Sequence, residues 1–232
     1  MRRFARLAAT LLLLVLSFPL GASSPQDPLW GKAVELARAG KDWVPQTASF
    51  LLELVDDGGV PRESWQSWYR ISVSPSGDMI LEVTRAVHNG ADTTEKERES
   101  QKKRKATPFS MGDNPFDPLL QETVDAAPRG ETATVAGRRC ARYDFSMKKK
   151  DGAVLTGTSW LDERTGAPVE VSYTGSRLPR GVLELATTLR YAPGPGGEAF
   201  LKEARVEGVA GILFLRRSFR TSITIEGYAR RG

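Results

Sequence analysis

The side chains best suited to covalent chemistry are scarce, because the 232-residue sequence contains one histidine, His88, and one cysteine, Cys140. A serine-based catalytic triad would have to use His88 as its base, yet no Gly-x-Ser-x-Gly segment supplies an activated serine. A pair of Cys140 with His88 would have the right residue types, but no local signature brings the two together. Sites built on several imidazole ligands are excluded. We therefore expect a protein that is not an enzyme and holds no metal or cofactor.

Two pairs of neighbouring acids, Asp56-Asp57 and Asp162-Glu163, could in principle serve as general acid and base. Consecutive residues of a strand point to opposite faces, so the members of each pair would diverge. Both pairs come where an alternating segment ends, and Asp at such positions usually accepts hydrogen bonds from nearby backbone amides. We interpret them as turn residues. No phosphate-binding glycine loop and no calcium-loop spacing occur.

The positive charge of the chain is concentrated in two segments. The sequence has 33 basic and 28 acidic residues, a net of +5, of which three arginines lie in residues 1–22. The segment 95–105 adds six basic residues against three acidic ones. Without a basic face elsewhere, nucleic-acid binding is disfavoured. The charged segment is either a solvated loop or a contact for anionic lipid or an acidic partner, and the sequence leaves both open.

The N-terminus has the pattern of a cleavable signal peptide. Arg2, Arg3 and Arg6 precede an almost wholly apolar run over residues 7–16, and small residues follow up to Ser23. The apolar run is shorter than the roughly 20 residues that a membrane-spanning helix needs. We expect residues 1–22 to be the signal peptide and residues 23–232 to form one exported, soluble, periplasmic β domain. Cys140 is far from the cleavage region, so the protein is not expected to be a lipoprotein, and its thiol should be buried in a strand.

The elements that would position any site change character along the chain. A helix is predicted over 28–39, with Asp27 as its N-cap, Pro28 in its first turn and Gly40 at its end. From residue 46 the hydrophobic period changes to two, and glycine-rich or proline-rich turns separate the segments. Strands are expected near 46–56, 63–74, 79–88, 131–135, 138–148, 154–162, 168–174, 182–191, 200–208 and 212–225.

Short turns between successive strands indicate an antiparallel meander and disfavour βαβ crossovers. About ten strands are too many for a flat open sheet. The predicted fold class is therefore mainly β: a single strongly curved antiparallel sheet, an incomplete barrel, with two or three short helices closing the open side.

A charged insertion at about 92–118 interrupts the meander. Residues 92–105 are polar all round and are expected to form a solvated helix or a mobile loop. A short helix is predicted from Pro118 to about Val124. Three apolar residues of the insertion, Phe109, Met111 and Phe116, are candidates for a lid.

The concave face of such a sheet is expected to be larger than the helices can fill, which would leave a ligand cavity. The side chains expected to line it come from five of the predicted strands: Phe50, Leu52, Trp65, Tyr69, Ile71, Leu81, Val83, Tyr143, Phe145 and Trp160.

The sequence resembles the LolA-like superfamily of periplasmic carriers for outer-membrane lipoprotein sorting. The resemblance is carried by the leading helix, the long meander, and two local stretches, Gly137-Arg138-Arg139-Cys140-Ala141-Arg142-Tyr143 and Trp160-Leu161-Asp162-Glu163-Arg164-Thr165-Gly166-Ala167-Pro168. It covers roughly residues 28–226. It implies an incomplete barrel with helices over its open side, and a concavity that takes acyl chains or other apolar ligands.

Three functions are weighed on this basis. The first is a non-enzymatic carrier or binding protein for lipid or lipoprotein acyl chains, with a membrane or an envelope protein as a further partner. The second is an envelope protein–protein interaction or stress-sensing module that binds no lipid. The third, a hydrolase using His88, has the least support.

Overall fold

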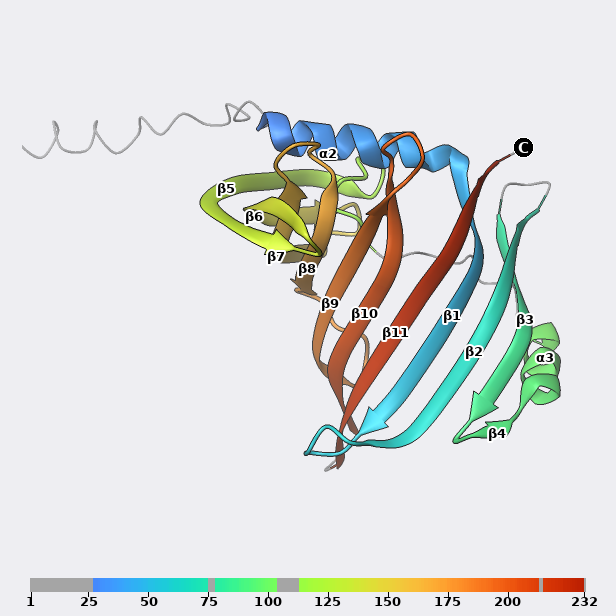
Figure 1. Ribbon diagram of the computed structural model, residues 1–232. Helices are drawn as coiled ribbons and strands as arrows, with labels where there is room; N and C mark the ends of the chain where they lie inside the picture. Colours follow the sequence, from blue (N-terminus) through green and yellow to red (C-terminus); the bar gives the residue numbers. More distant parts are fainter. Residues whose placement is uncertain (1–26, 75–77, 104–112, 213–214, 232) are drawn as a thin grey trace, which may run out of the picture.

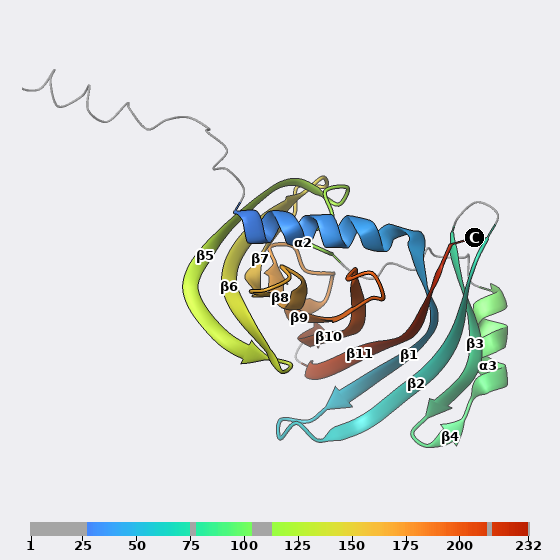
Figure 2. The same ribbon diagram turned by 45° about the horizontal axis from the view of Figure 1, so that its top comes forward.

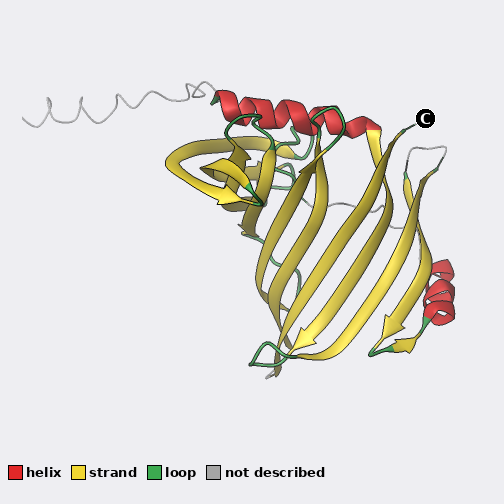
Figure 3. Cartoon of the chain, in the orientation of Figure 1, coloured by secondary structure: helices red, strands yellow, loops and turns green. Residues whose placement is uncertain are grey.

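The computed structural model describes residues 27–74, 78–103, 113–212 and 215–231, and in them the chain forms one sheet of eleven strands with two α-helices (Figures 1 and 3). The first 26 residues, which include the predicted signal peptide, lie outside the described part. No helix within the described residues is long and apolar enough to cross a membrane.

Helix α2 spans Pro28–Ala39 and begins as the sequence predicts. The Asp27 carboxylate accepts a hydrogen bond from the Leu29 amide at 2.9 Å, which satisfies one of the free donors at the helix start. Trp30, Ala33 and Val34 form its buried stripe. The helix continues through the 3₁₀ turn η1, Gly40–Asp42, directly into the first strand.

All strand pairs are antiparallel, in the order β4-β3-β2-β1-β11-β10-β9-β8-β7-β6-β5. The first long strand pairs with the last one, so the two ends of the domain meet in the middle of the sheet. The sheet does not close, and β5 and the β3–β4 pair form its edges. The predicted fold class is confirmed. The strands are β1 Trp43–Val55, β2 Pro61–Val73, β3 Met79–His88, β4 Ala91–Asp92, β5 Gln121–Val135, β6 Arg138–Lys149, β7 Val154–Asp162, β8 Pro168–Gly175, β9 Val182–Pro193, β10 Ala199–Ile212 and β11 Leu215–Arg230.

The sheet curls beneath α2, which lies along one end of it (Figure 2). The main core forms where the buried stripe of α2 meets the inner face of β6 to β11. Gly157 marks a place of very close approach, because a Cβ atom there would stand 2.0 Å from the Ser172 carbonyl oxygen. Only glycine allows β7 and β8 to pack this closely on the inner face.

The predicted helix from Pro118 to Val124 is wrong. β5 begins at Gln121, and the residues before it form turns in which the Asp117 carboxylate accepts from the Leu119 amide. Leu119 and Leu120 are exposed, so a helix here would have no apolar surface to pack on. Pairing with β6 satisfies the backbone instead.

β5 also begins ten residues earlier than the strand predicted at 131–135. Its alternation is hidden in the sequence by Pro128 and by Gly130, whose φ is +71°, and the register with β6 shifts between Pro128 and Thr132. An edge strand tolerates a proline and a bulge that a central strand would not.

Helix α3, Thr94–Lys103, has no buried residue, yet it is docked on the free edge of β3 (Figure 1). Gln101 accepts from the Val83 amide and donates to the Leu81 carbonyl. Arg98 donates to the Val83 and Thr84 carbonyls, and the Thr94 hydroxyl accepts from the Ala86 amide. The polar stretch is therefore a helix, and its side chains form hydrogen bonds with the backbone N–H and C=O groups of β3 that a further strand would otherwise pair with.

Candidate functional site

The residues predicted to line a cavity fall into three places, and the largest group is a patch on β1, β2 and β3. Direct partners across an antiparallel pair project to the same face. Leu52 is opposite Trp65, and Tyr69 is opposite Val83. The members of this group are Phe50, Leu52, Trp65, Tyr69, Ile71, Leu81 and Val83, which the structure brings together on one face of the sheet.

Helix α2 covers only part of this inner face, because its buried stripe packs in the core formed with β6 to β11. Ile71 and Val83 are buried, at 5% and 1% exposure. Five of their neighbours are half-buried and form what we call the open apolar face: Phe50, Leu52, Trp65, Tyr69 and Leu81. Partly exposed aromatic and aliphatic side chains gathered on one concave surface are typical of sites for apolar ligands.

Tyr143 and Phe145 lie on the same side of the sheet but belong to the filled core under α2. Their rings stand 5.8 and 6.0 Å from the ring of Trp30. Phe116, expected in a lid, is fully buried 4.7 Å from Trp30 and is also part of this core. These three residues do not line an open cavity because Trp30 of α2 fills the space above β6. Phe109 and Met111 lie outside the described residues.

Trp160 is on the opposite face. It pairs with Arg142 on β6 and Glu170 on β8, whereas its neighbours Ser159 and Leu161 are buried toward the core. Alternation along β7 makes this necessary, since residues 159 and 161 face inward. The expectation that Trp160 joins the cavity is therefore corrected.

The hydroxyl of Tyr143 ties α2 to the sheet. It donates to Asp27 Oδ1 at 2.6 Å, the oxygen that also caps the helix. Burial, together with this bond to Asp27, raises the pKa of Tyr143 far above its usual value. The sequence shows the cap but not this second role, because Asp27 and Tyr143 are 116 residues apart.

His88 and Cys140 do not form a catalytic pair. His88 stacks on Trp65, with the ring centroids 4.7 Å apart and an interplanar angle of 10°. Cys140 is on β6 near the other edge of the sheet, it is buried as predicted, and burial raises the pKa of its thiol. A thiol held in its protonated form is a poor nucleophile.

The two predicted acidic pairs lie at turns, and one aspartate of each pair accepts hydrogen bonds from backbone amides of its turn. Asp56 Oδ1 accepts from the amides of Gly58 and Val60, and Asp162 Oδ1 accepts from those of Arg164 and Thr165. Within the described residues, no three His, Cys, Asp or Glu side chains gather where they could hold a metal ion.

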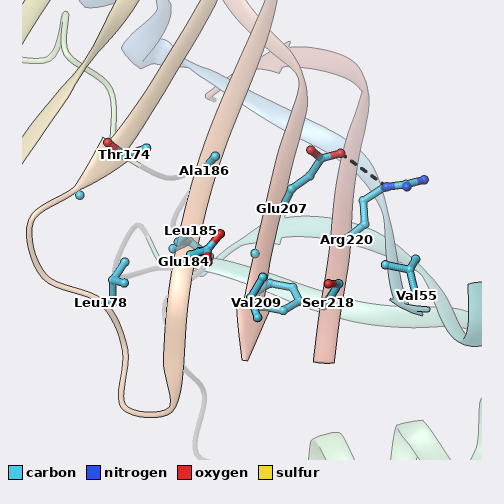
Figure 4. A pocket seen from close by; sticks show the side chains of 13 residues that line it. Val55, Thr174, Leu178, Glu184, Leu185, Ala186, Glu207, Val209, Ser218 and Arg220 are labelled. Carbon is cyan, nitrogen blue, oxygen red and sulfur yellow. Dashed lines mark ion pairs between the residues drawn. The ribbon is translucent and has the colours of Figure 1, made fainter. Parts of the chain in front are cut away.

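A hollow of about 650 Å³ occurs elsewhere, at the lower ends of β8 to β11 (Figure 4). Glu207 and Arg220, paired at 3.5 Å, are among its lining residues, and none of the predicted cavity residues is. Glu207 lies three residues after the core residue Ala204, and Arg220 lies three residues before the core residue Ile223. Residues an odd number of positions apart on a strand point to opposite faces, so both side chains are on the outer face. Alternation identifies which residues share a face, but it does not show where on that face a hollow lies.

Comparisons with known proteins gave likenesses to solved structures alone: no protein-family model and no curated protein matches the chain. One such structure is a DUF1329 family protein from Desulfovibrio piger, with 13% identity, a TM-score of 0.37, and coverage of 87% of this chain and 91% of that one. A LolA superfamily protein from Nitrosomonas europaea has 10% identity and a TM-score of 0.38, covering 88% and 92%.

A third structure, from Vibrio parahaemolyticus, is described as an outer membrane lipoprotein-sorting protein domain. It has 15% identity and a TM-score of 0.39, and the match covers 87% of this chain and 93% of that one. These TM-scores and identities are low, so the fold rests on the strand order described above and no function is taken from the likenesses. The chain is thus similar to proteins that include members of the LolA superfamily, the group that its sequence resembles.

Proposed function

We propose that this protein is a non-enzymatic periplasmic carrier or binding protein that takes an acyl chain of a lipid or lipoprotein on the open apolar face. The single observation that supports it most is the grouping of half-buried Phe50, Leu52, Trp65, Tyr69 and Leu81 on the inner face, away from the buried stripe of α2. The exported, soluble state is part of the proposal and depends on the predicted signal peptide.

The free energy available on such a surface is sufficient for binding. Each methylene removed from water contributes about 0.8 kcal/mol, so ten methylenes would contribute roughly 8 kcal/mol before the entropic cost of association. The open apolar face offers aromatic rings and branched side chains but no charged group among its five members. It therefore favours a chain over a headgroup.

The test compares two neighbouring positions on β1. Leu52 faces inward opposite Trp65, whereas Leu51 is also half-buried but faces outward opposite Gln66. Leu52→Glu should lower the affinity for a fluorescent fatty acid at least tenfold, because a carboxylate would replace apolar contact surface, and Leu51→Glu should leave it within about twofold. Native mass spectrometry of the purified protein should show co-purifying lipid. Equal effects of the two changes, or no binding by the unmodified protein, would contradict the proposal.

A second candidate, an envelope protein–protein interaction module, is supported by the edge of β3. Its backbone groups at Leu81, Val83 and Ala86 bond to side chains of α3 and not to a strand. A partner's extended segment could pair with the same groups if α3 moved away. Detection of a protein partner by a chain that retains no lipid would favour this function over the carrier.

A further inference from the structure

A second hollow, of about 430 Å³, lies where α2 faces the turns at its end of the sheet. Four elements contribute to it: α2, the start of β6, the β7–β8 turn and the β9–β10 turn. Its lining consists of Lys32, Leu36, Arg138, Asp162, Arg164, Thr165, Ala167, Pro193 and Gly197. None of these belongs to the open apolar face, so this hollow is a separate place in the molecule.

Three cationic side chains converge on this hollow from three different elements: Lys32 from α2, Arg138 from β6 and Arg164 from the β7–β8 turn. None of the three forms an ion pair with a carboxylate within the described part of the chain. The adjacent Arg139 shows the difference, since it is paired with Glu163 at 2.7 Å. The neighbouring carboxylate of Glu163 is thus already paired with Arg139. Lys32, Arg138 and Arg164 line the hollow without such a carboxylate partner among the described residues.

Asp162 is the single acid that lines the hollow, and the fold already uses it. It is 7% exposed, and its Oδ1 accepts from the amides of Arg164 and Thr165, both at 2.9 Å. Burial raises the pKa of Asp162, but these hydrogen bonds and the nearby Arg138 outweigh it, so the pKa is below its usual value. The carboxylate therefore stays ionised and holds the turn, and the hollow keeps a net positive charge.

The position of Lys32 depends on a glycine in the opposite turn. Gly166 has a φ of +73°, and a Cβ atom there would stand 2.8 Å from the Cβ of Lys32. The aliphatic stem of Lys32 therefore packs against Gly166 at the place where Lys32 lines the hollow. The turn chemistry and the helix together set where this charge lies.

We propose that this hollow binds an oxyanion, a phosphate or carboxylate group carried either by a lipid headgroup or by a small solute. Two guanidinium groups and one ammonium group supply the donors and charge that such a group needs, and arginine matches the planar or tetrahedral arrangement of its oxygens. The site is independent of the acyl-chain function, because it uses no residue of the open apolar face.

The test replaces all three cations, Lys32→Gln, Arg138→Gln and Arg164→Gln, in one variant. A control variant of equal net charge carries Arg180→Gln, Lys202→Gln and Arg217→Gln, three exposed residues that do not line the hollow. Binding is measured to inorganic phosphate by calorimetry, and by co-sedimentation to vesicles of phosphatidylcholine with and without phosphatidylglycerol.

The unmodified protein and the control variant should bind phosphate or the anionic vesicles, and the site variant should lose at least about tenfold in affinity, with the effect weakened by salt. Binding to vesicles identifies a headgroup ligand, and binding to phosphate alone identifies a solute. Equal losses in both variants, or no binding of either probe by the unmodified protein, would overturn the proposal. Arg164→Gln, at an exposed turn position, gives the same comparison with Arg180→Gln should the triple site variant not fold.

Discussion

The attachment of α3 to the edge of β3 leads to a quantitative prediction for Gln101→Ala. The change removes the amide that accepts from Val83 N at 3.3 Å and donates to the Leu81 carbonyl. Each such bond contributes about 1 kcal/mol net, so the attachment of α3 should weaken by roughly 2 kcal/mol. No buried side chain of α3 can offset this loss. Arg98 and Thr94 still contact β3, so the helix is expected to open more often without leaving permanently.

Hydrogen exchange of the folded protein measures this opening. A change of 2 kcal/mol corresponds to about a 30-fold faster exchange of the Ala86 amide, which donates to the Thr94 hydroxyl of the same helix and not to Gln101. Lys102→Ala, at an exposed position of the same helix, is the matched control and should leave the exchange of Ala86 nearly unchanged. If Gln101→Ala does not accelerate the exchange of the Ala86 amide, or if both variants accelerate it equally, the hydrogen bonds from Gln101 do not hold α3 on the edge.

Three further predictions concern the framework. Tyr143→Phe should lower the free energy of unfolding by about 1.5–3 kcal/mol in urea denaturation, because Asp27 loses a charge-assisted hydrogen bond; no loss would show that the bond does not hold α2. Gly157→Ala should destabilise by about 1–3 kcal/mol through contact with β8 backbone, whereas Gly31→Ala, with nothing within 4 Å of its Cβ, should stabilise α2 by about 0.5–1 kcal/mol, and thermal unfolding compares the two. The pKa values of four tyrosines are raised, mainly by burial: Tyr143, Tyr173 (to about 12), Tyr191 and Tyr228. Their contribution to the free energy of unfolding should be complete below about pH 10 and fall as the pH rises toward these raised values. Absorbance titration should show these tyrosines ionising later than free tyrosine, and ionisation of all four at the ordinary pKa would contradict their burial.

Much of the fold is visible in the sequence because hydrophobic alternation reports directly which residues share a face. Leu52 and Trp65 could be placed together on this ground, and the Asp27 cap and Pro28 located the first helix. Alternation fails where register shifts. A shift between Trp68 and Tyr69 puts Val87 opposite Gln66 on the outer face, whereas unbroken alternation along β3 would place it with Val83 on the inner face.

The candidate site was harder to predict, since it depends on which part of the inner face the helix covers. Nothing in the local pattern distinguishes Tyr143, which lies beneath Trp30, from Tyr69, which does not. The sequence pattern also does not reveal the second hollow, beside α2. Lys32, Arg138 and Arg164 are far apart in the sequence and meet only because the order of the strands brings three elements to one end.

The two ends of α2 are both fastened. At its start Asp27 is bonded to Tyr143 on β6, and beyond its end the carbonyl of Asp42 accepts from the Arg231 amide at 2.7 Å, next to β11. Hydrogen bonds at both ends therefore hold the helix to strands on either side of the main core, and they oppose its movement away from the sheet. On the proposed function, room for an acyl chain would come from bending of β2, β3 and β4, which no helix fastened in this way spans within the described residues. Binding on that proposal would change the curvature of the sheet, and α3, which is bonded to β3, would move with these strands.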